Sequence, residues 1–393
     1  MANKIYFDHA ATTPTKKEVV EAMLPYFTEN FGNPSSVYKI ASVAKEAIGL
    51  AREEVAKAIN ASDREIFFTS GGTEADNWAI IGIAETYKNK GNHIITTQIE
   101  HHAVLHTCEY LEKHGYEVTY LPVDENGLIN LEELKKAIKD TTILISIMFA
   151  NNEIGTIEPI AEIGKIAKEN NVIFHTDAVQ AFGHMKIDVE KMNIDLLSMS
   201  SHKLYGPKGV GALYVKKGVK LRAFIHGGAQ EKRRRSGTEN VPGIVGFGKA
   251  VELVMSSQKA ESKRQSELRD YLISEISNKI PYAKLNGHPT QRLANNVNFS
   301  FKFIEGESLL IMLDMKNICT SSGSACTSGS LDPSHVLSAI GLDDELAKGS
   351  LRISLGESNT KEEVDYFIKE LVAIVERLRS SSVEYKNFIK ANS

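Results

Sequence analysis

The sequence predicts an α/β protein with a large domain built on a mostly parallel sheet and a small α+β domain. Short apolar segments alternate with helical patterns between residues 65 and 215, as in parallel sheets covered on both faces. After residue 251 the chain becomes more polar and mixes strands with helices. A length of 393 residues also exceeds one typical domain. We expect the large domain at 16–251 and the small one at 1–15 and 252–393.

Each element follows from its local pattern. Helical spacing predicts helices at 17–27 and 41–59. Short apolar runs predict strands at 65–68, 93–97, 116–121, 142–148, 172–175, 195–199 and 211–215. In the small domain we expect a polar helix at 252–279, a half-exposed strand at 295–301, a helix at 307–315, a Ser/Gly-rich loop at 320–330, a helix near 335–340, a strand at 351–355 and an amphipathic helix at 362–379.

The composition indicates a soluble globular protein. The formal net charge of −4 argues against nucleic acid or an anionic membrane as the main partner. No apolar run approaches the roughly 20 residues that a membrane span needs. The N-terminus does not look like a signal peptide, and three cysteines form no disulfide framework. We therefore expect a cytoplasmic location.

Lys203 lies where the predicted strand at 195–199 runs into a turn that ends at Gly209. Ligands of α/β sheets bind at such strand ends. A lysine desolvated there loses its proton readily and becomes a nucleophilic amine that forms Schiff bases. The alternative is an ordinary surface lysine, one of 46 lysines and arginines. Lys208, in the same turn, is interpreted in that ordinary way.

A glycine-containing turn from Ser70 to Thr73 joins a predicted strand to a helix that opens at Glu74. Glycine lets the backbone approach a phosphate, and the free N–H groups of a helix N-terminus favour its charge. Thr73 adds a hydroxyl. The GxGxxG pattern and the Walker lysine are missing, so a nucleotide is weakly indicated. The alternative is a loop in which Thr73 caps the helix.

Asp177 comes at the end of a predicted buried strand. A carboxylate there is costly unless it meets a cation, although it also caps helices in many proteins. The protonated ring nitrogen of pyridoxal 5′-phosphate (PLP) is such a cation, and Gln180 is placed to donate to the ring hydroxyl. His101 and His102 follow another strand, where a histidine stacks on a flat cofactor or moves protons. Together with Lys203 and the glycine turn, these residues indicate PLP.

Eight motifs occur in order along the chain. They are Tyr-Phe-Asp-His-Ala-Ala-Thr-Thr-Pro from residue 6, Phe-Gly-Asn-Pro-Ser-Ser from 31, Thr-Ser-Gly-Gly-Thr-Glu-Ala-Asp-Asn from 69, Glu-His-His-Ala-Val from 100, Asn-Asn-Glu-Ile-Gly from 151, Ser-Ser-His-Lys-Leu-Tyr-Gly-Pro-Lys-Gly from 200, Arg-Ser-Gly-Thr-Glu-Asn from 235 and Ser-Ser-Gly-Ser-Ala-Cys from 321. With them the chain from Tyr6 to Gly356 resembles the class-V, fold-type-I PLP enzymes. More narrowly, it resembles cysteine desulfurases of the NifS and IscS type.

The resemblance implies how the cofactor is held. Lys203 binds it through the amine, Asp177 pairs with the ring nitrogen, and His101 stacks on the ring and assists proton transfer. The implied cofactor-binding residues are Gly72, Thr73, His101, Asn152, Asp177, Gln180, Ser200, His202, Lys203 and Thr238. Thr238 would reach the phosphate of a neighbouring subunit, which implies a homodimer.

Asn33 and Arg352 are the implied substrate-binding residues. Arg352 lies in the predicted strand at 351–355, and its fork suits a carboxylate. The alternative for Arg352 is an internal salt bridge. The sequence departs from the family pattern at Tyr38, Ala229 and Arg233, which leaves the entrance and the dimer rim less well defined.

The three cysteines differ in their surroundings. Cys108 and Cys319 lie in apolar segments and are expected to be buried, whereas Cys326 lies in the Ser/Gly-rich loop and is expected to be exposed. The resemblance implies that Cys326 is the nucleophile that accepts sulfur as a persulfide. Cys319 and Cys326 are too few for a metal site, and we expect no metal.

The resemblance implies an enzyme that converts L-cysteine to L-alanine, with Lys203, Cys326 and His101 as catalytic residues. A sulfur-acceptor protein, such as an iron–sulfur scaffold, would take the sulfur. Two alternatives stay open. One is a selenocysteine lyase or an aminotransferase of the same fold, and the other is a sulfur-handling partner without enzymatic activity.

Overall fold

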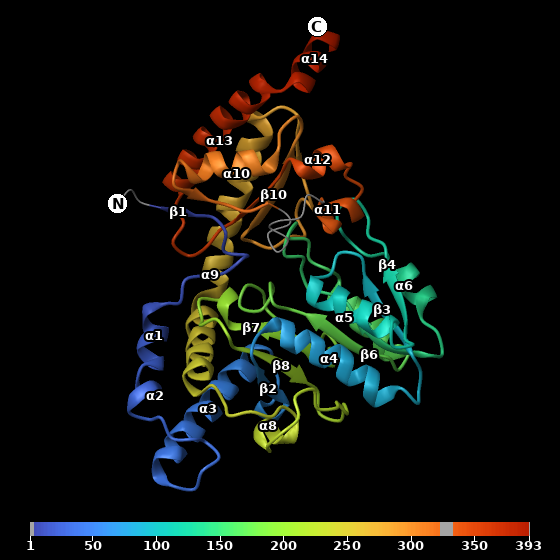
Figure 1. Ribbon diagram of the computed structural model, residues 1–393, viewed down its shortest axis with the longest axis vertical. Helices are drawn as coiled ribbons and strands as arrows, with labels where there is room; N and C mark the ends of the chain where they lie inside the picture. The colour runs from blue at the N-terminus through green and yellow to red at the C-terminus, as the bar shows by residue number, and fades with distance from the viewer. Residues whose placement is uncertain (1–3, 323–332, 393) are drawn as a thin grey trace.

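The computed structural model describes residues 4–322 and 333–392. Two bodies lie one above the other and are joined by a long helix, α9 (Val241–Lys279) (Figure 1). The lower body contains a seven-stranded sheet and the upper body a three-stranded sheet. The predicted α/β architecture is therefore confirmed.

The large sheet is mostly parallel, as predicted. Its spatial order is β2-β8-β7-β6-β5-β3-β4, and only β8 runs antiparallel to its neighbours. The strands are β2 (Ile66–Thr69), β3 (His93–Thr97), β4 (Glu117–Leu121), β5 (Thr142–Ser146), β6 (Ile173–Asp177), β7 (Leu196–Ser200) and β8 (Gly211–Val215). Apart from the edge strand β4, these strands are almost entirely buried, which explains why they appear in the sequence as continuous apolar runs.

Helices cover both faces of this sheet (Figure 1). One core packs α4 and α5 against the strands, and the other packs α3, α7 and the first half of α9. The helices of the lower body are α1 (Lys17–Met23), α2 (Pro25–Thr28), α3 (Lys39–Ala58), α4 (Gly72–Tyr87), α5 (His102–Glu112), α6 (Leu131–Ala137), α7 (Ile160–Glu169) and the short α8 (Gln230–Arg233).

Helix α9 belongs to both cores. Phe247 and Val251 pack in the lower core, and Leu272 and Ile276 in the upper core. The helix begins eleven residues before the predicted start at 252, because its first part is apolar on several faces and is packed in the core. The expected domain boundary falls inside this helix, and the boundary itself stays a prediction.

The upper body contains the antiparallel strands β9 (Ala283–Leu285), β10 (Asn296–Phe301) and β12 (Ser350–Ser354). Its helices are α10 (Gly306–Asp314), α11 (His335–Ala339), α12 (Asp344–Lys348), α13 (Lys361–Ser381) and α14 (Val383–Asn392). The prediction of a half-exposed strand at 295–301 is wrong, because β10 is buried throughout. Its polar side chains find partners inside: Asn286 donates to the side chains of Asn298 and Ser300.

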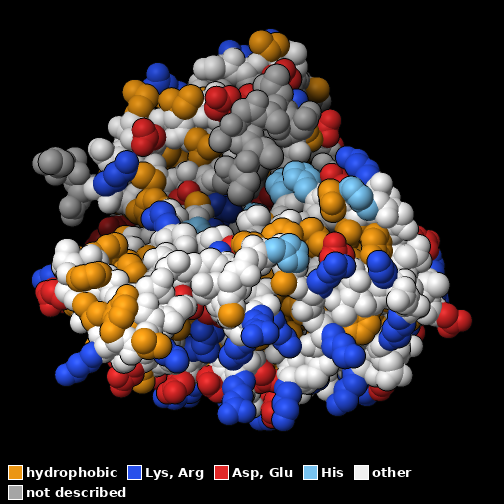
Figure 2. Space-filling model, turned by 60° about the horizontal axis from the view of Figure 1, so that its bottom comes forward, with side chains coloured by type: hydrophobic (Ala, Val, Ile, Leu, Met, Phe, Trp, Pro, Cys, Tyr) orange, Lys and Arg blue, Asp and Glu red, His pale blue; other side chains and the backbone are white. Residues whose placement is uncertain are grey.

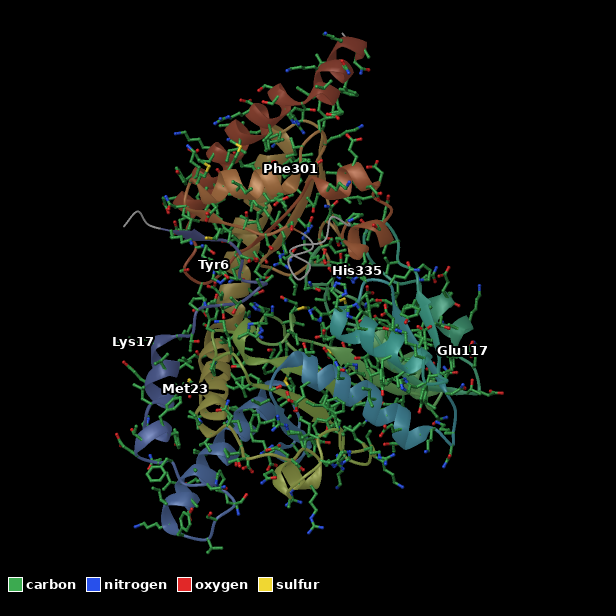
Figure 3. All side chains as sticks on the ribbon, viewed as in Figure 1. Tyr6, Lys17, Met23, Glu117, Phe301 and His335 are labelled. Carbon is green, nitrogen blue, oxygen red and sulfur yellow. The ribbon has the colours of Figure 1, made fainter. Side chains whose placement is uncertain are left out.

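The N-terminal segment begins against the upper body. β1 (Ile5–Tyr6) pairs in parallel with β11 (Ile318–Cys319), and residues 8–13 then run between the two bodies. Figure 3 labels Tyr6 near this junction. In the described part of the chain, no helix has the length and apolar character that crossing a membrane requires.

Candidate active site

A cavity of about 290 Å³ lies at the carboxyl ends of β6 and β7, with the N-terminal segment and β12 contributing to its wall. This is the end of the sheet at which α/β proteins bind ligands. Ten residues predicted from the sequence line it: Gly72, Thr73, His101, Asn152, Asp177, Gln180, Ser200, His202, Lys203 and Arg352. Residues more than 270 positions apart in the chain thus meet at one cavity.

Lys203 ends a single helical turn, Ser201–Lys203, that follows β7 directly. Its Nζ donates to the carbonyl oxygens of Ala10 at 2.6 Å and Ala11 at 2.7 Å. The amine is thereby held at the cavity wall by the N-terminal segment. The predicted position of Lys203, at a strand end beside a tight turn, is confirmed.

Asp177 is the last residue of β6 and is 6% exposed. Burial raises the pKa of its carboxyl group to about 6, while the Val179 N–H and the charge of Lys203 act in the opposite direction. The Val179 N–H donates to Oδ1 at 2.9 Å. Gln180 donates through Nε2 to the Ala10 carbonyl at 3.0 Å. A cation bound in the cavity would therefore stabilise the ionised form of the Asp177 carboxyl group.

His101 is the N-cap of α5, and its Nδ1 accepts a hydrogen bond from the Ala103 N–H at 3.1 Å. Since Nδ1 accepts, the ring proton is carried by Nε2. Burial and the neighbouring charge of Lys203 lower the pKa of His101 to about 4. The His101 ring is therefore neutral at pH 7.

The other end of the cavity has the character of an anion site. Helix α4 begins at Gly72, so the N–H groups of its first turn and the Thr73 hydroxyl lie beside Ser200 and His202. An adjoining cavity is lined by the same four residues, by Lys208 and by Glu74, whose carboxylate is paired with Arg235. Lys208 was interpreted as an ordinary turn residue, yet it brings a positive charge to this end.

Arg352 projects from β12 and is 2% exposed. Nη2 donates to Asp8 Oδ1 at 2.9 Å, and Nη1 donates to the Asn152 carbonyl at 3.0 Å. The guanidinium thus makes the internal salt bridge of the alternative interpretation and also lines the cavity, while its binding of a substrate carboxylate stays a prediction.

Two of the described site residues that were predicted, Asn33 and Thr238, do not line this cavity. Asn33 and Thr238 are exposed, and Asn33 accepts a hydrogen bond from the Ser35 N–H through its side chain. Cys326 lies outside the described residues. Of the other cysteines, Cys108 is buried as expected, and burial raises the pKa of its thiol. Cys319 is only half-buried.

Sequence reasoning missed other residues of the cavity wall, namely Ala10, Ala11, Asp76, Met148, Ala150 and Val179. Asp76 is 1% exposed, and its Oδ1 has no hydrogen-bond partner among the described residues. Helical spacing held a signal for it, because Asp76 lies four residues after Gly72 on α4, so the two share a face. Ala10 and Ala11 carry no such signal, since they act through backbone carbonyls.

The sequence pattern of the aminotransferase class-V family matches residues 5–367. This chain belongs to the aminotransferase class-V family.

Relatives that match this chain over its full length indicate a particular group within the family. The chain is 61% identical over 392 residues to a cysteine desulfurase IscS from Clostridium botulinum (strain Hall), covering 99% of each chain. A solved structure of a NifS-like protein superposes with a TM-score of 0.90 at 42% identity, covering 95% of this chain and all of the other. A structure described as SspA in complex with cysteine superposes with a TM-score of 0.81 at 42% identity, covering 90% and 99%.

The cavity fits PLP, the cofactor of the cysteine desulfurases in this family. Lys203 would supply an amine for the aldehyde, Asp177 would supply a buried acid for the ring nitrogen, and Thr73, Ser200 and His202 would supply donors for the phosphate. Gly72 is also needed, because a Cβ there would come within 2.6 Å of Val179 Cγ2. A larger residue would push on the side chain of Val179, the residue whose N–H donates to Asp177.

The titration of Asp177 predicts how cofactor binding depends on pH. A pyridinium stabilises the Asp177 carboxylate, so PLP binding should lower the pKa of Asp177 from about 6. Below that pH the apoprotein carries a proton on Asp177, which it must lose when PLP binds. PLP affinity of the apoprotein should therefore fall as pH drops from 7 to 5, approaching about tenfold per pH unit.

Fluorescence titrations of apoprotein with PLP at several pH values measure this dependence. Protonation of the PLP phosphate contributes in every variant, so Asp177→Asn is the control that isolates the carboxylate. Its affinity should be lower at pH 7 and vary less with pH. Parallel curves for the two proteins would contradict the assignment of Asp177.

Proposed function

We infer that this chain is a PLP-dependent cysteine desulfurase that converts L-cysteine to L-alanine and transfers the sulfur to Cys326. The observation that carries this inference is one cavity in which Lys203, Asp177 and Arg352 meet, in a chain that matches cysteine desulfurases along its full length. An amine, a buried acid and a carboxylate-binding cation are what a PLP enzyme acting on an amino acid requires.

Cofactor binding is distributed along the cavity. Lys203 would hold PLP through its amine, Asp177 through the ring nitrogen and Gln180 through the ring oxygen. Thr73, Ser200 and His202 would hold the phosphate, together with the first turn of α4. When bound, PLP acts as an electron sink for negative charge at the substrate Cα.

Side chains of this protein bind the substrate and transfer its protons. Arg352 binds and orients the substrate carboxylate, and burial at 2% exposure strengthens that interaction because water competes little. The Lys203 amine, once released from the cofactor, removes the Cα proton as a general base. Neutral His101 has its N–H at Nε2, from where it donates to the reacting groups.

Cys326 is proposed as the sulfur acceptor. Its thiolate attacks the substrate sulfur, the C–S bond breaks with its electron pair going to the alanine moiety, and a persulfide remains on Cys326. The support is the Ser-Ser-Gly-Ser-Ala-Cys motif, in which this cysteine is preceded by small residues only. A cytoplasmic sulfur acceptor, such as an iron–sulfur scaffold protein, would then receive the sulfur.

We also propose a homodimer. An apolar surface patch on α1, α2, α3 and the loop before α3 supports it; its members are Val20, Leu24, Phe27, Phe31, Val37, Tyr38, Val43 and Leu50. Phe31 is 67% exposed, and the side chain of Val37 is fully exposed. Figure 2 shows hydrophobic side chains gathered on the left of the lower body, where these helices lie. Such a patch is costly in water unless a second protein covers it.

The dimer is tested with Leu24→Asp/Phe27→Asp. Two buried carboxylates at the interface should shift the protein from dimer to monomer, as measured by light scattering after size exclusion. Val383→Asp, an exposed apolar position on α14, is the matched control and should stay dimeric. A monomeric wild type at micromolar concentration, or an unchanged double variant, would contradict the proposal.

The activity is tested with purified holoenzyme, L-cysteine and a thiol reductant. Alanine and sulfide should appear in equal amounts. An aminotransferase would instead need a keto acid, and a selenocysteine lyase would act on L-selenocysteine while leaving L-cysteine nearly unused. Absence of both products in a protein that carries PLP would favour the sulfur-handling partner without enzymatic activity.

A further inference from the structure

The N-terminal segment at residues 8–13 contacts several side chains of the candidate active site. Ala10 and Ala11 accept hydrogen bonds from Lys203, and Ala10 also accepts from Gln180. Further along, Thr13 Oγ1 donates to the His202 carbonyl oxygen. Asp8, at the start of this segment, makes the ion pair with Arg352. The segment at residues 8–13 therefore contacts both the Lys203 amine and the Arg352 guanidinium.

The segment has a fixed shape of its own. The hydroxyl of Tyr6 donates to the carbonyl oxygens of Asp8 at 3.1 Å and Thr12 at 2.9 Å, which closes the loop between them. The Ala10 N–H donates to the Ser354 hydroxyl at 2.8 Å, and Asp8 bridges to the backbone of Ser354. Ser354 lies two residues after Arg352 on β12, so Asp8 is anchored to the strand that carries its partner.

Two of the three guanidinium nitrogens of Arg352 have hydrogen-bond partners among the described residues. Nη2 binds Asp8 and Nη1 binds the Asn152 carbonyl, whereas the buried Nε has no hydrogen-bond partner among the described residues. A guanidinium has five N–H donors in a planar fork, so two contacts leave others for a carboxylate. The Asp8 side chain is 19% exposed and the Arg352 side chain 2%, so water competes little with the pair.

A second buried carboxylate, that of Glu153, lies close enough to Arg352 for their charges to interact. Glu153 is 5% exposed; burial raises its pKa to about 7, and the charge of Arg352 acts against that rise. Its Oε2 accepts a hydrogen bond from Ser334. If Asp8 were absent, the buried guanidinium would lose its ion pair, and Glu153 is the acid to which it would turn.

We propose that Asp8 is a positioning residue for the substrate carboxylate: it holds the guanidinium of Arg352 in the orientation that receives L-cysteine. Asp8 does not touch the substrate in this role. It acts by accepting a hydrogen bond, so an amide oxygen at the same place should replace it in part. This inference rests on the proposed carboxylate-binding role of Arg352.

The test compares Asp8→Ala, Asp8→Asn and Arg352→Ala as PLP-loaded holoenzymes, with KM and kcat for L-cysteine measured separately. Loss of a charge-assisted hydrogen bond should raise KM about tenfold in Asp8→Ala, with kcat changed less than about threefold. Asp8→Asn should stay within about threefold of the wild-type KM, and Arg352→Ala should be more impaired than either. Asp365→Ala, which removes a surface ion pair with Lys361, is the control and should behave as wild type.

The outcomes distinguish the proposed carboxylate-binding role of Arg352 from the proposed positioning role of Asp8. An unchanged KM in Arg352→Ala would overturn the carboxylate site itself. A raised KM in Arg352→Ala with an unchanged KM in Asp8→Ala would overturn only the role of Asp8, as would an Asp8→Asn variant as impaired as Asp8→Ala. Should Asp8→Ala not fold, as judged by circular dichroism, Asp8→Ser is measured in its place with the same expected rise in KM.

Discussion

Lys203→Ala is expected to lower the desulfurase rate by about 1,000-fold or more, because the variant lacks both the covalent attachment of PLP and the general base. Other contacts of the cofactor remain in this variant: Asp177, His101 and the donors at the start of α4 still line the cavity. The variant should therefore still bind PLP, but should release it on dialysis. Borohydride reduction should fix PLP to Lys203 in the wild type and to no lysine in the variant.

Lys220→Ala serves as the matched control, because Lys220 is an exposed lysine on the loop after β8. It should keep the wild-type rate and the wild-type attachment of PLP. The assignment of Lys203 fails if Lys203→Ala remains active, or if reduction attaches the cofactor to another lysine at full yield.

Cys326→Ala is expected to lose alanine and sulfide formation by more than about 1,000-fold, since the nucleophile that accepts sulfur is removed. The variant keeps Lys203 and Arg352, so L-cysteine should still bind and change the absorbance of bound PLP. A variant that binds substrate but makes no product would locate the defect at sulfur transfer. The measurement combines alanine and sulfide assays with absorbance spectra.

Cys108→Ala and Cys319→Ala are the controls for this prediction. Cys108 is buried in α5, where burial raises the pKa of the thiol and keeps it protonated. Cys319 lies in β11, paired with the N-terminal strand. Both variants should retain desulfurase activity after correction for stability. Full sulfide release by Cys326→Ala would contradict a persulfide on that residue.

The architecture of the large sheet could be predicted from sequence because its strands are buried on both faces. Such strands form continuous apolar runs, and the polar residues that end them, such as Asp177, stand out. Lys203 was found for the same reason, since its strand and its turn are both conspicuous. Strand β10 was misjudged because asparagines and serines paired inside a core resemble an exposed face.

Other features depend on contacts that no local pattern reveals. Asp8 and Arg352 are 344 residues apart, and only the pairing of the N-terminal segment with β12 brings them together. Ala10 and Ala11 hold Lys203 through main-chain carbonyls, which any residue possesses. The neutral state of His101 follows from its burial and from the Ala103 N–H, neither of which spacing along the chain can show.

One measurement tests the central claim most directly. Holoenzyme is mixed with one equivalent of L-cysteine without reductant, and then alanine is quantified and the thiol-containing peptides are weighed by mass spectrometry. We expect one alanine for each sulfur atom added to the Cys326 peptide, and no addition on the Cys108 or Cys319 peptides. Alanine formed without sulfur on Cys326, or sulfur on another cysteine in equal yield, would contradict the account.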